Sequence, residues 1–190
     1  KSLITYSIPI SFNRFVTSIM LSIEFILIPR RLVEGGFNYQ QSIEEYGRLT
    51  GMAMPLLFFP SLVTSSLATT LVPAISEAVS LKNFRLVNYR ISKSIQLSFI
   101  MGFLFTALFL IFPEEIGNLM YKNEKIGHIL YLLSFTCIFL YVQQTLLGIL
   151  NGLGKQGISL RNSMVGSAIR ISFVYFCIPL YGIPGYIWGM

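Results

Sequence analysis

Three charged side chains, Arg14, Glu24 and Arg170, lie inside apolar stretches of the sequence, where a charge needs a specific reason. Arg14 comes about 16 Å into the first stretch at 1.5 Å per helical residue, which is close to the middle of a bilayer. An arginine at that depth costs at least ~2.5–3.5 kcal/mol on insertion scales. We therefore expect Arg14 to face a polar interior, where it either holds an anionic substrate or pairs with a neighbouring helix.

Glu24 and Arg170 allow similar alternatives. Glu24 follows Arg14 at a separation of about 80° around a helix, so the two cannot form an adjacent pair on one face. Glu24 lies nearer the end of its stretch. There it is either hydrated, or it orients a cation or senses a coupling ion. Arg170 is the second cation within an apolar stretch, and it either contacts substrate or supports a neighbouring helix.

Two other groups of residues interrupt apolar stretches. Gln143 and Gln144, beside Thr145, place amides in the middle of a stretch, where they either bond between helices or contact substrate. Pro73 and Glu77 come about 33 Å and 39 Å after Gly51, beyond the ~30 Å hydrocarbon layer. Pro73 is expected to bend or end the helix and Glu77 to meet water and nearby cations, which predicts an exit from the membrane that acts as a hinge or gate.

The same residues exclude most other classes of function. The chain has no Asp, and no sequence cluster resembles a hydrolase triad or a metal site, so we expect no enzyme, no metal and no cofactor. The segment GILNGLGKQ (148–156) has five residues between Gly148 and Gly154 and then Gln after Lys155, so it does not match a phosphate-binding loop. The net charge of +6 is spread over short loops, which disfavours nucleic acid and favours an anionic membrane face.

The elements that must position these residues are membrane helices. Hydrophobic residues make up 54% of the 190-residue chain and charged residues only 12%, about half of the fraction in soluble domains. Five apolar segments each reach the ~20 residues that a helix needs to cross a bilayer. They run over residues 3–27, 49–78, 92–112, 126–150 and 160–180, with a sixth that starts near residue 183 and is incomplete. We predict an all-α polytopic membrane bundle, one domain over residues 1–190, within a longer protein.

The loops between these segments predict sides of the membrane. One side carries seven cations, Lys1, Lys82, Arg85, Arg90, Lys93, Lys155 and Arg161, and the other carries five. The positive-inside rule places the first side, with the start of the chain, in the cytoplasm. Residues 81–91 have apolar side chains at helical spacing with cations between them, which fits either an amphipathic helix on the membrane surface or an ordinary loop helix.

The second apolar segment carries the most specific motif of the chain. Residues 46–78, YGRLTGMAMPLLFFPSLVTSSLATTLVPAISEA, resemble a helix of the stage V sporulation protein B and polysaccharide exporter family. That family belongs to the multidrug/oligosaccharidyl-lipid/polysaccharide exporter superfamily, which includes the lipid II flippases. The segments SIPISFNRFVTSIMLSIEFILIPRRL and GILNGLGKQ are similar to the family's preceding helix and a later helix–loop junction. The resemblance covers nearly the whole chain.

The resemblance implies helices seven to twelve of a fourteen-helix transporter, with the other lobe of the parent chain and membrane lipids as partners. It implies that a lipid-linked saccharide crosses the cytoplasmic membrane by alternating access, in spore cortex assembly. It also implies that Glu24 replaces an aspartate and that Arg48 is the nearest counterpart of a substrate-binding arginine, although its spacing to the following prolines differs. A cation-coupled drug antiporter of the same superfamily and a membrane scaffold remain as alternatives.

Overall fold

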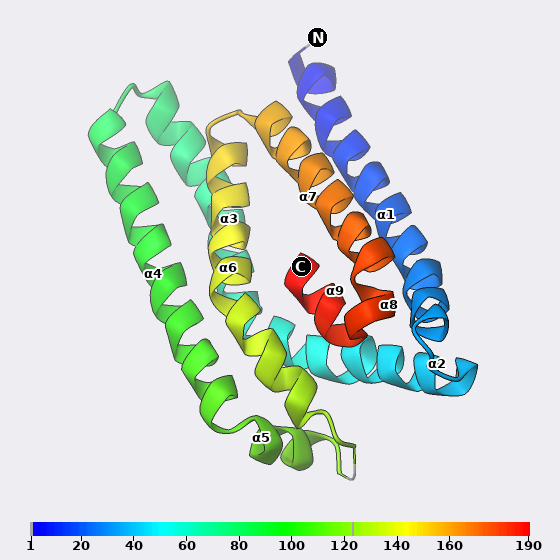
Figure 1. The fold of residues 1–190 in the computed structure, drawn as a ribbon. Helices are drawn as coiled ribbons and strands as arrows, with labels where there is room; N and C mark the ends of the chain where they lie inside the picture. The colour runs from blue at the N-terminus through cyan, green and yellow to red at the C-terminus, as the bar shows by residue number, and fades with distance from the viewer. Residues whose placement is uncertain (1, 123) are drawn as a thin grey trace. The chain divides into compact units, whose positions relative to one another are not determined.

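The computed structural model describes the backbone of residues 2–122 and 124–190 and the side chains of residues 15–122 and 124–190. This part of the chain is helical throughout and contains no strand (Figure 1). The elements are α1 (Ser2–Glu34), α2 (Tyr39–Gly47), a π-helical segment η1 (Arg48–Ala53), α3 (Met54–Ser80), α4 (Phe84–Ile111), α5 (Pro113–Met120), α6 (Gly127–Gly152), α7 (Gln156–Phe176), α8 (Ile178–Tyr181) and α9 (Ile183–Gly189).

The helices form two compact units. Residues 1–54 and 156–190 make up unit 1, and residues 55–155 make up unit 2. Glu24 and Arg170 belong to unit 1, whereas Pro73 and Gln143 belong to unit 2.

In unit 1, α1 and α7 pack side by side along their length (Figure 1). At the end of α1 the Arg31 guanidinium lies 3.4 Å from the centre of the Tyr175 ring on α7 and also pairs with Glu34. The chain then turns through residues 35–37, where Gly36 has φ +99°. A Cβ added at Gly35 would lie 2.8 Å from the Pro179 carbonyl oxygen, so glycine at this position lets the turn lie directly against α8. The ends of α1 and α7 are thus fixed to each other.

The helix α2 begins at a capping box that the sequence contains. The Asn38 side chain accepts a hydrogen bond from the Gln40 backbone, and the Gln41 side chain accepts one from the Asn38 backbone. The residues that follow continue through η1 into α3, so that residues 39–80 form one helical stretch of 42 residues. This stretch begins ten residues before the start that the hydrophobic pattern predicts.

In unit 2, α6 packs closely against both α3 and α4. A Cβ added at Gly148 would lie 2.6 Å from the Ala68 carbonyl oxygen, and one at Gly102 would lie 2.8 Å from the Ile138 Cα. Ser98 on α4 and Thr145 on α6 share a buried hydrogen bond of 2.5 Å. Small residues at these positions let the helix backbones approach, as is usual inside membrane bundles.

Hydroxyl groups along α3 bond to their own helix. Ser61 donates to the Phe58 carbonyl oxygen at 2.7 Å, and Thr64 donates to that of Ser61 at 2.9 Å. Thr70 bonds in the same way to Leu67. These polar side chains can therefore lie in an apolar medium without a partner on another helix.

Three helical stretches in the described part of the chain are long and apolar enough to cross a membrane. They are Tyr39–Ser80, Phe84–Ile111 and Gly127–Gly152. They correspond to the second, third and fourth predicted segments, and the prediction of five complete spans and a partial sixth is not confirmed beyond them. The described part of α1 carries several charges near its end, and α7 carries Arg161 and Arg170 among many small polar residues, which lowers the hydropathy of both helices.

Residues 81–91 do not form a helix of their own. Leu81 and Lys82 lie in a turn, and Phe84–Ile91 are the first two turns of the 28-residue helix α4. The Asn83 side chain accepts a hydrogen bond from the Leu86 backbone and so fixes where α4 begins. The predicted surface segment is thus the basic end of a long apolar helix.

Candidate functional site

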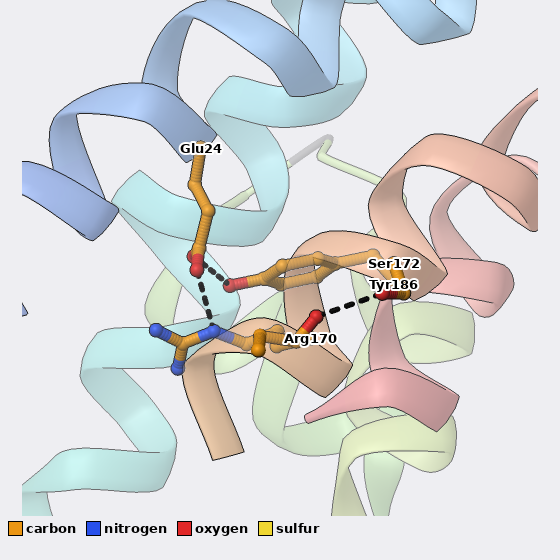
Figure 2. Close-up of polar contacts among 5 residues, drawn as sticks. Glu24, Arg170, Ser172 and Tyr186 are labelled. Atoms are coloured by element: carbon orange, nitrogen blue, oxygen red, sulfur yellow. Dashed lines mark hydrogen bonds and ion pairs between the residues drawn. The ribbon is translucent and has the colours of Figure 1, made fainter. Parts of the chain in front are cut away.

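A buried ion pair joins the two long helices of unit 1. Glu24 on α1 is 2% exposed, and its Oε1 lies 2.6 Å from the Nε of Arg170 on α7. The Tyr186 hydroxyl on α9 donates to the second carboxylate oxygen at 3.4 Å. Figure 2 shows the Glu24 carboxylate between the guanidinium and the phenol ring, with one partner for each oxygen. We call Glu24, Arg170 and Tyr186 the buried charge cluster.

The short helix α9 reaches this cluster because the chain reverses sharply after α7. Gly182 has φ +67°, a left-handed conformation that glycine adopts without strain. A Cβ added at Gly185 would lie 2.7 Å from the Cys177 carbonyl oxygen, and one at Gly189 would lie 2.4 Å from the Phe173 Cβ. Glycine at these positions lets α9 lie directly against the end of α7, which brings Tyr186 to Glu24.

The cluster compensates one buried charge with another. An isolated carboxylate in a low-dielectric interior carries a large desolvation cost, which a partner with good hydrogen-bond geometry offsets. The Glu24 side chain is 3% exposed and that of Arg170 22% exposed, so the pair opens to its surroundings on the arginine side. Glu24 is therefore an engaged carboxylate and not a vacant site for a cation.

Arg170 has donors that the cluster does not use. Its Nε bonds to Glu24, and among the residues whose side chains are described its two terminal nitrogens contact no acceptor. In Figure 2 both terminal nitrogens lie on the side of the guanidinium away from Tyr186. Two parallel N–H donors on a planar cation match the oxygens of a phosphate or carboxylate. The terminal nitrogens of Arg170 can therefore bind an anion while its Nε stays paired with Glu24.

The sequence singled out Glu24 and Arg170 separately, and the structure brings them together. Tyr186 gave no sequence signal, because a tyrosine in an apolar segment is ordinary and carries no charge. Tyr46 also lies beside this region, where its ring meets Phe25 edge-on at 5.8 Å. The side chain of Arg14 falls outside the described residues, so its predicted role stays a prediction.

Arg48 lies in η1 and forms an ion pair of 2.9 Å with Glu45, one helical turn earlier. Both side chains are about 30% exposed. The guanidinium is therefore engaged locally at the start of the long helical stretch, and nothing in this geometry tests whether it also contacts substrate. Its role as implied by the resemblance stays a prediction.

Four other predicted positions lie in unit 2. Gln143 is exposed and Gln144 is half-buried, whereas their neighbour Thr145 makes the hydrogen bond between helices. Pro73 lies inside α3, which continues to Ser80, so the helix does not end at the proline. Glu77 is exposed, and in the described part of the chain it forms no ion pair with the cations that follow it.

The backbone next to Pro73 has a partner from another helix. The Arg90 guanidinium on α4 donates a hydrogen bond to the carbonyl oxygen of Ala74. This contact holds α4 against the proline-containing turn of α3. In the described residues no group of three or more histidine, cysteine or acidic side chains is placed to bind a metal ion.

Comparison with known families identifies the chain. The MatE family matches residues 50–176, more than half of its length. The chain belongs to the MatE family. This confirms the resemblance to the exporter superfamily that the sequence motifs indicate. The MatE match includes Arg170, whereas Glu24 and Tyr186 lie outside the matched range.

Curated relatives extend the likeness to almost the whole chain. Stage V sporulation protein B of Bacillus subtilis (strain 168) is 30% identical over 96% of this chain and 36% of its own length. Sporulation protein YkvU of the same organism is 25% identical over 92% of this chain and 39% of its own length. The uncharacterized membrane protein YabM is 25% identical over 97% of this chain. The chain thus spans little more than a third of these relatives, and no solved structure matches it.

Proposed function

We propose that the protein is a transporter that moves a lipid-linked cell-wall saccharide across the cytoplasmic membrane by alternating access. The observation that carries this proposal is Arg170, which a buried carboxylate holds in place while its two terminal nitrogens stay without an acceptor among the described side chains. A lipid-linked saccharide carries a pyrophosphate, whose oxygens match such a donor pair. Membership of the MatE family and the helices long enough to span a bilayer support a membrane transporter.

The buried charge cluster suits an anionic rather than a cationic substrate. A fixed guanidinium gives two charge-assisted hydrogen bonds without the entropic cost of ordering a free side chain. Because Glu24 is engaged with Arg170, it is not available to bind a cationic drug or a coupling Na⁺, which the antiporter alternative requires. Two relatives are named for sporulation, which supports a role in assembling spore cell wall.

Orientation is part of the same proposal. The start of the chain and the turn between α3 and α4 lie on the cytoplasmic side, as the distribution of lysine and arginine indicates. The remaining lobe of the parent protein supplies the other half of the cavity that alternating access needs.

Flipping of lipid II in cells depleted of their native flippase tests the proposal with the full-length protein. We expect the parent to restore flipping and Arg170→Gln, expressed at the same level, to lose at least 90% of it, because about 2 kcal/mol of phosphate recognition is a factor of roughly thirty. Arg161→Gln on the same helix is the matched control and keeps full flipping, since Arg161 is exposed.

Two results would overturn the proposal. If Arg170→Gln flipped lipid II as well as the parent, the buried charge cluster would not be the substrate site. If the parent failed to flip lipid II but made the cells resistant to cationic drugs, the protein would be an antiporter of the same superfamily.

A further inference from the structure

The turn between α3 and α4 must lie at a surface of the bilayer. Residues 39–80 and 84–111 are both long and apolar enough to span a membrane, and only three residues, 81–83, connect them. Two consecutive spanning helices joined by so short a turn cross in opposite directions. The turn therefore lies where the hydrocarbon layer meets the headgroups.

The length of α4 places its beginning in the same region. A helix of 28 residues is about 42 Å long, whereas the hydrocarbon layer is about 30 Å thick. The excess of about eight residues falls at the beginning of α4, because the cations of this helix, Arg85, Arg90 and Lys93, all lie within its first ten residues. Residues 94–111, in contrast, carry no charge.

The side chains at this end combine apolar surface with positive charge. Leu81, Phe84 and Tyr89 are 69%, 64% and 61% exposed, and Lys82 and Arg85 between them are also exposed. We call these five residues the α4 basic end. Aromatic and aliphatic side chains next to lysine and arginine are typical of segments at the headgroup level of a membrane.

Four cations lie near the turn between α3 and α4, and two of them make side-chain hydrogen bonds within the protein. Arg90 donates to the Ala74 carbonyl oxygen, and Lys93 donates to the Gln96 side chain at 3.3 Å. The Lys82 and Arg85 side chains form no hydrogen bond or ion pair with the described part of the chain. Since α4 contains no acidic residue, this helix does not neutralise either charge.

The surrounding packing holds the α4 basic end in place. Val87 on α4 is buried in one cluster with Leu71, Ile75 and Ala78 of α3. The Asn83 backbone donates to the Ala78 carbonyl oxygen at 2.9 Å, which closes the turn. Lys82 has φ +53°, the left-handed conformation that this turn requires. The backbone that carries Lys82 and Arg85 is therefore held in place by its packing against α3.

We propose that the α4 basic end binds the headgroups of anionic phospholipids. The phosphate accepts hydrogen bonds from the Arg85 guanidinium and the Lys82 ammonium, while Phe84 and Leu81 enter the boundary between headgroups and acyl chains. The negative surface of a bilayer attracts cations at this depth, by about fivefold in affinity for each one. The site is independent of substrate transport and needs only that α3 and α4 span the membrane.

Native mass spectrometry of the full-length protein, released from nanodiscs that contain equal amounts of phosphatidylglycerol and phosphatidylcholine, tests this proposal. We expect the parent to retain phosphatidylglycerol preferentially. The Lys82→Gln/Arg85→Gln variant should retain about five- to thirtyfold less of it, with no change in phosphatidylcholine. Both side chains are exposed, so the variant should keep the elution profile of the folded parent.

Two further variants make the result specific. Lys82→Arg/Arg85→Lys keeps both charges and should keep phosphatidylglycerol within about twofold of the parent. Lys122→Gln/Lys125→Gln removes the same charge from exposed positions near α5 and should also leave lipid retention unchanged. Equal retention by Lys82→Gln/Arg85→Gln and the parent, or an equal loss in the Lys122→Gln/Lys125→Gln control, would overturn the proposal.

Discussion

At the scale of single residues, the stability of unit 1 depends on the ion pair in which Glu24 and Arg170 neutralise each other. A buried ion pair often contributes little net stability compared with apolar residues, but removal of one partner leaves an uncompensated charge. The pair is asymmetric, because Glu24 is almost completely enclosed while Arg170 is 22% exposed. The carboxylate is therefore the more costly group to leave alone.

This asymmetry predicts the result of a double-mutant cycle. Arg170→Gln should destabilise the full-length protein by about 2–4 kcal/mol, and Glu24→Gln by less, about 1–2 kcal/mol, since water reaches the unpaired arginine. The double variant should be within about 1 kcal/mol of the parent, because neither charge remains. Thermal unfolding in detergent measures all four proteins, and additive losses in the double variant would show that the pair is not coupled.

The sequence predicts two of the three residues of the buried charge cluster, but not their pairing. Charge inside an apolar stretch is a strong signal, so Glu24 and Arg170 were both predicted as functional positions. Their pairing was not predictable, because 146 residues separate them and the packing of α1 against α7 leaves no local pattern. Tyr186 was missed for a different reason, namely that its hydroxyl becomes distinctive only when Gly182 and Gly185 bring α9 back to α7.

At the scale of elements, hydrophobic length predicts the three helical stretches that are long and apolar enough to span a membrane, but it predicts their ends poorly. The predicted segments 92–112 and 126–150 correspond to α4 and α6, but α4 begins at Phe84 because polar residues at a membrane surface can continue a helix. The capping box at Asn38 and Gln41 was visible in the sequence, but a rule based on apolar runs does not detect it. Pro73 was expected to bend or end a helix, and α3 continues through it.

Substitution of Gly148 tests the close packing of α6 against α3. Gly148→Ala should destabilise the protein by about 1–3 kcal/mol, because its Cβ would lie 2.6 Å from the Ala68 backbone and one helix must move. Gly166→Ala on α7 is the control, since in the described part of the chain no atom outside its own helix turn lies within 4 Å of its Cβ position. Its better helix propensity should leave stability unchanged or raise it by up to about 1 kcal/mol. Melting temperatures in one detergent compare the two, and an undisturbed Gly148→Ala would contradict the close approach.

At the scale of the whole molecule, the central question is which side of the membrane each end of α4 faces. The helix is long enough to cross completely, so Lys82 before it and Lys122 after the short helix α5 should lie on opposite sides. Membership of the MatE family agrees with a membrane protein. The charge distribution is the basis of our proposal that the Lys82 side is cytoplasmic.

Cysteine labelling in intact cells tests this arrangement. In a background with Cys137→Ser and Cys177→Ser, a membrane-impermeant maleimide should label Lys122→Cys directly and Lys82→Cys only after the cells are permeabilised. The two positions are both exposed, so accessibility within the protein does not distinguish them. Labelling of both positions from outside would mean that α4 does not cross, and reversed labelling would invert the proposed orientation.

The separation of Glu24 and Arg170 along the chain also constrains how the protein is made. At about 5–20 residues per second, a ribosome needs roughly 7–30 seconds to extend the chain by the 146 residues from Glu24 to Arg170. During that time α1, which the sequence predicts to cross the membrane, has a carboxylate without its partner, and we expect it not to reach its final depth in lipid. We expect α1 to stay in a hydrated environment until α7 has been translated. Formation of the ion pair is then a late step of membrane insertion, and it completes unit 1 only after unit 2 has been synthesised.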